Sequence, residues 1–116
     1  MLALTSLADE DPTFRTHEAV REPIAAACAE HPAAATFREL GESEEGRVLY
    51  GVVLGHGDQA VSLIAGNHAD EPVGPETLRA FVLNALRNRE KMAPWFRRYR
   101  FVIVPHTNPD GEARNR

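Results

Sequence analysis

The second half of the chain alternates two kinds of apolar pattern, and this alternation constrains the fold more than any other feature. Residues 60–65 form a nearly continuous apolar run, as expected for a strand covered on both faces. Apolar residues then recur at helical spacing from Leu78 to Leu86. A second apolar run, residues 101–104, follows. Strand, helix and strand in this order predict a right-handed parallel crossover, and therefore an α/β fold.

The first half predicts a helix followed by an antiparallel hairpin. Asp11 and Pro12 suit the N-cap and the first position of a helix, which Pro23 is expected to kink or to divide into two short helices. Residues 36–40 and 47–54 are predicted to be strands joined by a polar turn. The expected fold is thus a mixed sheet, with an N-terminal antiparallel hairpin beside the parallel β-α-β crossover.

Composition and charge exclude several classes of protein. The 116 residues are 43% hydrophobic and 26% charged, as in an ordinary globular domain. The net charge of −4 gives no general attraction to nucleic acid or to an anionic membrane. The chain shows no secretory signal and no run of about 20 apolar residues. The single cysteine, Cys28, fits a reducing compartment, so we expect a cytoplasmic protein with neither nucleic acid nor membrane as partner.

Two polar segments follow the two predicted parallel strands. Residues 66–71 follow the first strand and residues 106–111 follow the second. Because ligands of open α/β sheets gather at the carboxyl ends of parallel strands, we expect both segments to meet at one edge of the sheet. Within the first segment, His68 and Glu71 combine an imidazole with a carboxylate, which is a common pair of zinc ligands. Asp70 is an alternative to Glu71, and a surface pair or a helix cap is the alternative to a metal site.

The second segment contains Asn-Pro-Asp-Gly at residues 108–111, which predicts a type I turn. Such a turn would be a plain connection or would deliver Arg114 or Arg116 to the metal edge. A guanidinium there would stabilise an oxyanion or hold a substrate carboxylate. His106 is close enough to the proposed metal site to contact a metal ligand without binding the metal itself. The other histidines are predicted to lie at the surface: His17, His31 and His56.

A basic stretch of residues 87–100 surrounds Trp95 and Phe96. Its cations are predicted to solvate the end of a helix, where the helix dipole favours positive charge. Binding of an anion or a nucleic acid is the alternative.

Three segments, in this order, resemble those of the zinc carboxypeptidases. Residues 41–47 (GESEEGR) resemble the GxSxxGR hairpin of that family. Residues 66–71 (GNHADE) resemble its HxxE metal motif after a buried strand, and residues 108–111 resemble its NPDG turn. The resemblance implies a carboxypeptidase-like domain, of which residues 1–116 would be the N-terminal part.

The resemblance also implies a site and a reaction. His68 and Glu71 would be two ligands of a Zn²⁺ ion, and Arg116, or alternatively Arg114, would polarise the scissile carbonyl. Water activated by zinc would hydrolyse a C-terminal peptide bond or a related amide bond. In the family the third zinc ligand, the general-base glutamate and an Asn-Arg pair for the substrate carboxylate follow the NPDG turn, and none can be placed in this chain. These 116 residues alone are therefore expected to bind zinc weakly and to hydrolyse nothing.

Three alternative functions predict other substrates or partners. A zinc deacylase of the aspartoacylase or succinylglutamate desuccinylase type also uses HxxE and would act on N-acyl amino acids, although the hairpin and the full NPDG turn favour a carboxypeptidase and a peptide substrate. A non-catalytic α/β module would bind a partner through the basic stretch, and a catalytically inactive homologue is a third alternative. Because little sequence follows the NPDG turn to cover the second face of the sheet, we expect exposed apolar surface and self-association through it.

Overall fold

The computed structural model describes residues 15–67 and 73–114, which form one mixed sheet with helices. The sheet has the order β1-β2-β4-β3. Strands β1 and β2 pair antiparallel, as do β2 and β4, whereas β3 and β4 are parallel. The predicted antiparallel hairpin and parallel β-α-β crossover are confirmed. The elements are α1 (His17–Glu30), β1 (Ala35–Glu42), β2 (Val48–Leu54), β3 (Gln59–Ile64), α2 (Val73–Arg87), α3 (Arg89–Arg98), β4 (Tyr99–Val104) and α4 (Pro109–Arg114).

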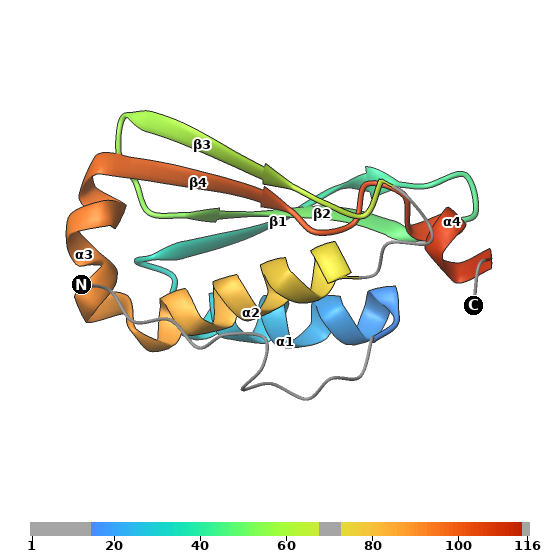
Figure 1. The fold of residues 1–116 in the computed structure, drawn as a ribbon, viewed down its shortest axis with the longest axis horizontal. Helices are drawn as coiled ribbons and strands as arrows, with labels where there is room; N and C mark the ends of the chain where they lie inside the picture. Colours follow the sequence, from blue (N-terminus) through green and yellow to red (C-terminus); the bar gives the residue numbers. More distant parts are fainter. Residues whose placement is uncertain (1–14, 68–72, 115–116) are drawn as a thin grey trace.

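Helices α1 and α2 lie side by side under one face of the sheet, while α3 and α4 lie at its two ends (Figure 1). The core sits between this helical layer and the inner face of β2 and β4. Its fully buried members include Val20, Ile24, Tyr50, Val52, Leu54, Val82, Ala85 and Ile103. The helical spacing read from residues 78–86 therefore identified the buried side of α2 correctly. No helix within the described ranges is long and apolar enough to cross a bilayer.

Strand β3 corrects one prediction, because it is not covered on both faces. It lies at the edge of the sheet, where Val61 and Leu63 are half-buried towards the helices and alternate residues are exposed. The side chain of Ile64 is 58% exposed and that of Leu40, on β1, is 60% exposed. In the described part of the chain the helical layer covers one face only. The residues of β3 therefore alternate between half-buried and exposed, although most of them are apolar. Exposed apolar sheet surface was expected, and self-association through it stays a prediction.

The start of α1 differs from the prediction. Asp11 and Pro12 lie outside the described residues, and the helix begins at His17. Thr16 is the N-cap, and its Oγ1 accepts a hydrogen bond of 3.2 Å from the backbone N–H of Ala19. Both Asp-Pro and Thr are good starting signals, and here the later one forms the cap.

Pro23 does not divide α1 into two helices, because one helix runs from His17 to Glu30 around it. A proline inside a helix costs about 3 kcal/mol through the lost hydrogen bond and the ring clash. Val20, Ile24 and Cys28 are nearly inaccessible on the face that packs against the sheet and α2. Burying each such side chain stabilises by roughly 1.5–3 kcal/mol, which together outweighs the cost of the proline.

Candidate functional site

The loops that follow β3 and β4 are joined by backbone hydrogen bonds. The N–H of Thr107 donates to the carbonyl of Ala65 at 3.1 Å, and the N–H of Asn108 donates to the carbonyl of Gly66 at 3.0 Å. The side chain of Asn108 also donates to the carbonyl of Asn67 at 3.3 Å, and the hydroxyl of Thr107 bonds to the Asn67 side chain. The expected meeting of the two polar segments is confirmed for residues 66 and 67, while the rest of the first segment lies outside the described residues.

Gly66 permits the close approach of these loops. Its φ of +76° lies in the region that favours glycine. A Cβ at this position would lie 2.7 Å from the carbonyl oxygen of Pro105 and 2.8 Å from the Cα of His106. Any larger residue would therefore push the two loops apart, immediately before the segment that contains His68.

The residues with the predicted chemistry lie largely outside the described part of the chain. His68, Asp70 and Glu71 fall between Asn67 and α2, and Arg116 follows α4. Their assignments as metal ligands and as the functional arginine stay predictions. In residues 15–67 and 73–114, no three His, Cys, Asp or Glu side chains are gathered closely enough to hold a metal ion.

The NPDG segment was predicted as a type I turn, and in the structure it is the first turn of helix α4, which was not predicted. Pro109 is the first residue of α4, and the side-chain oxygen of Asn108 accepts a hydrogen bond of 3.0 Å from the N–H of Gly111. The carbonyl of Asn108 accepts from the N–H of Glu112 at 3.2 Å. Asparagine as a cap followed by proline at the first position is a regular helix start, so the sequence contained this signal.

Asp110 joins α4 to the β1–β2 hairpin, a contact that the sequence analysis missed. Its Oδ1 accepts from the Oγ of Ser43 at 2.7 Å and from Nη1 of Arg47 at 3.0 Å, while its Oδ2 accepts from the N–H of Glu45 at 3.1 Å. The Ser43 hydroxyl oxygen in turn accepts from the N–H of Arg47 at 2.9 Å. The Ser and Arg of GESEEGR thus bind the Asp of NPDG, which links two of the three family-like segments.

Acid is expected to weaken this link. The hydrogen bond from Ser43, with those from Arg47 and the Glu45 backbone, lowers the pKa of Asp110 below its ordinary value of 3.8. The stabilisation is therefore present above pH 3.8 and is lost as the pH falls through the lower pKa of the folded state. Thermal unfolding from about pH 5 to about pH 2 should show a larger loss of stability in the wild type than in Asp110→Asn. Parallel losses in both proteins would contradict the assignment.

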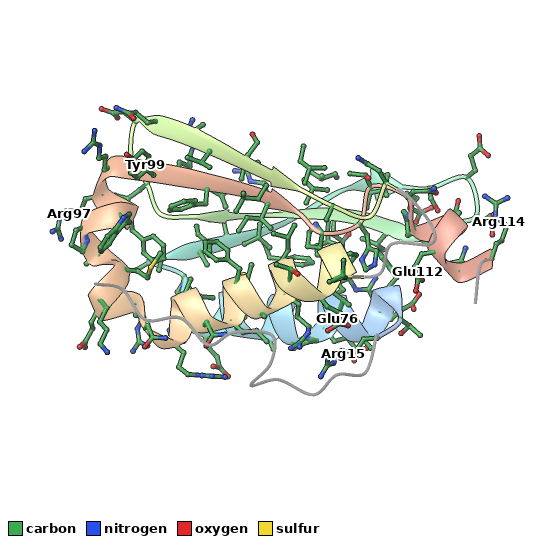
Figure 2. The ribbon with its side chains drawn as sticks, in the orientation of Figure 1. Arg15, Glu76, Arg97, Tyr99, Glu112 and Arg114 are labelled. Carbon is green, nitrogen blue, oxygen red and sulfur yellow. The ribbon has the colours of Figure 1, made fainter. Side chains whose placement is uncertain are left out.

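Arg114 lies on the last turn of α4, at the end of the sheet that holds the candidate site (Figure 2). Its side chain is 69% exposed, and its Nε lies 3.4 Å from Oε2 of Glu45. An exposed pair of this kind contributes little to stability. The structure thus places Arg114 beside the hairpin, and the choice between Arg114 and Arg116 as the functional arginine stays open.

His17 is buried, which corrects its predicted surface position. Its ring packs edge-on against His106, with ring centroids 5.0 Å apart, and lies 5.7 Å from the ring of Tyr50. Burial lowers the pKa of His17 below 6.5, so the ring is neutral near pH 7. His17 lies three residues before Val20 and therefore on the same helix face, so its spacing already indicated burial and only the polarity of the imidazole suggested a surface position. Of the other two, His56 is exposed as predicted and His31 is half-buried.

A buried ion pair holds the first turn of α2, directly after the segment with His68. The carboxylate of Glu76 accepts two hydrogen bonds of 2.7 Å from Arg15, one from its backbone and one from its side chain. It also accepts from Nε of Arg79 at 3.1 Å. Figure 2 shows Arg15 and Glu76 side by side below the sheet.

The basic stretch lies away from these contacts. Arg97 and Arg98 are exposed in the last turn of α3, as predicted for a solvated helix end. Arg97 and Tyr99 occupy the end of the sheet opposite to Glu112 and Arg114 (Figure 2). Cations of this stretch therefore lie too far away to serve the edge where the β3 and β4 loops meet.

Comparisons with known proteins agree on one family. The profile of the zinc carboxypeptidase family matches residues 20–116. A carboxypeptidase A from Helicoverpa armigera is 25% identical, with a TM-score of 0.74, over 89% of this chain and 27% of its own. A metallo-carboxypeptidase from Burkholderia cenocepacia is 27% identical, with a TM-score of 0.66, over 78% of this chain and 26% of its own. No curated protein sequence matches.

A more distant structure shows the same fold. Bovine thrombin-activatable fibrinolysis inhibitor, in complex with tick carboxypeptidase inhibitor, is 22% identical with a TM-score of 0.68. The match covers 86% of this chain and 33% of that protein. The chain therefore spans between about a quarter and a third of the structures that it matches.

Proposed function

The chain belongs to the zinc carboxypeptidase family, and from that premise we propose that it supplies two metal ligands to a zinc-dependent hydrolase of C-terminal peptide or related amide bonds. The observation that supports this most is the pairing of the loops after β3 and β4. It brings the backbone next to His68 against the start of the NPDG helix. A site at the carboxyl ends of parallel strands is where an α/β fold places its ligands.

The donor set of the HxxE segment suits zinc. His68 and Glu71 would hold the ion with an imidazole nitrogen and a carboxylate oxygen, both usual zinc ligands. When bound, zinc supplies a Lewis acid that polarises a carbonyl and lowers the pKa of water toward about 7. Gly66 and Asn67 would hold the backbone before His68 in place through their bonds to Thr107 and Asn108.

An arginine after the NPDG helix would act on the substrate. The guanidinium of Arg116, or of Arg114, would donate hydrogen bonds to the scissile carbonyl oxygen and stabilise the negative charge that develops there. Helix α4 begins at the paired loops, and this connection supports the proposal that an arginine at or after its end serves the site.

The test measures product release by the native protein, meaning the polypeptide as its own cells produce it. We expect a free C-terminal amino acid to be released from a peptide, the activity to be lost with a chelator, and zinc to restore it. Release from N-acyl amino acids and not from peptides would instead identify a deacylase. No hydrolysis of either substrate, with or without zinc, would favour a non-catalytic module or an inactive homologue.

A further inference from the structure

We propose that Asp110 is a positioning residue for the candidate metal centre: its carboxylate joins the β1–β2 hairpin to α4 and, through α4, fixes the two paired loops beside His68. This inference rests on the proposed function for its meaning. Its geometric part, the coupling from the hairpin to the loops, is carried by the contacts of the described residues alone.

All of the polar contacts described for the Asp110 carboxylate come from the hairpin. Ser43, Glu45 and Arg47 each donate to it, at distances of 2.7, 3.1 and 3.0 Å. Its side chain is 9% exposed, so these bonds replace water almost completely. A carboxylate that only solvated the surface of α4 would need neither burial nor donors from a segment more than sixty residues away.

Helix α4 depends on such outside contacts for its orientation. It has six residues, from Pro109 to Arg114, and isolated helices shorter than about 12 residues are marginal in water. Its first turn is capped by Asn108, and Asp110 holds the same turn against the hairpin. The position of this turn is therefore set by the cap on one side and by Asp110 on the other.

Asn108 connects the first turn of α4 to Gly66 and Asn67, which precede His68. Its backbone N–H donates to the carbonyl of Gly66 at 3.0 Å, and its side-chain amide donates to the carbonyl of Asn67 at 3.3 Å. Asp110 is the second residue after Asn108, within the same helical turn. If Asp110 releases the hairpin, α4 can tilt, and the bonds of Asn108 to Gly66 and Asn67 lengthen. The residue before His68 would then lose its support.

The experiment compares Asp110→Asn with Glu44→Gln, using amide hydrogen exchange and zinc titration of the native protein. Asparagine keeps the shape of Asp110 but removes the charge and turns an acceptor into a donor that faces other donors. Glu44 is exposed on the same hairpin, so its variant controls for the change in net charge. In Asp110→Asn we expect the amides of Thr107 and Asn108 to exchange roughly tenfold faster, whereas the amides of α1 keep the wild-type rate. Zinc affinity should fall roughly tenfold, in the range typical of outer-shell partners.

A purely structural role predicts a different pattern. It would accelerate exchange in α1 as much as at Thr107 and Asn108, with the zinc affinity of the folded protein unchanged, and this result would overturn the proposal. If Asp110→Asn does not fold, Ser43→Ala serves as the second variant, because it removes one donor and should give a smaller shift at the same two amides. A wild-type chain that binds no zinc would count against the proposed function, and the exchange rates would still decide whether Asp110 positions the loops.

Discussion

Replacing His68 by alanine is expected to weaken zinc binding by the native protein more than about 100-fold, since even the loss of an outer-shell partner costs 10- to 100-fold. The physical reason is the loss of a direct bond between an imidazole nitrogen and the ion. A catalytic zinc is normally held by three protein ligands, so the variant would retain two. A competition titration against a chromophoric zinc chelator would measure the affinity, and hydrolysis of a peptide would fall with it.

A matched histidine provides the control for this prediction. His56 is exposed in the turn after β2, and its backbone N–H donates to the carbonyl of Phe96 on α3, at the opposite end of the sheet from α4. His56→Ala should therefore leave the zinc affinity unchanged. Equal affinities for wild type and His68→Ala would show that His68 is not a ligand. A loss in His56→Ala instead would place the ion elsewhere.

The local pattern of the chain was enough to predict the hairpin, α2 and the two parallel strands. Apolar spacing from Leu78 to Leu86 depends only on helix geometry, and it identified the buried face of α2. The two strands of the hairpin were likewise bounded by glycines and charged residues. The parallel pairing of β3 and β4 followed because a strand-helix-strand order leaves few topologies, whereas the order of the strands in the sheet was not predicted.

Burial was harder to predict, because it depends on which layers cover a face. The run from Ala60 to Ala65 is apolar on both of its faces, yet the described helices cover only one. Nothing in the strand itself distinguishes a strand that is covered on both faces from one that is covered on a single face. The surface position predicted for His17 followed from the polarity of its imidazole, although the residue shares a helix face with Val20 and Ile24.

The role of Asp110 was beyond local sequence reasoning. Its partners Ser43 and Arg47 lie more than sixty residues earlier, and an Asp in an NPDG segment is explained equally well by turn formation. Only the fold places the hairpin against α4. By contrast, the helix start at Asn108 and Pro109 follows the usual preference for an asparagine cap and a proline at the first position, so α4 could have been predicted from the sequence.

Gly66→Ala is expected to lower the free energy of unfolding of the chain by about 3 kcal/mol. Two costs combine at this position. Holding alanine at a φ of +76° costs about 1–2 kcal/mol, as for any residue with a Cβ in the left-handed region. Its Cβ would also lie 2.7 Å from the carbonyl oxygen of Pro105 and 2.8 Å from the Cα of His106, and forcing such contacts costs about 1–3 kcal/mol.

Gly46→Ala separates these two costs. Gly46 has nearly the same backbone conformation, with a φ of +79°, but a Cβ there would meet nothing within 4 Å. We therefore expect this variant to lose only about 1–2 kcal/mol, the cost of the backbone conformation. Urea denaturation measures the free energy of unfolding of both variants. The difference between their losses is the cost of the close contact between the β3 and β4 loops. If the two losses were equal, Pro105 and His106 would have moved aside at little cost, and the close packing of the loops beside His68 would not depend on glycine.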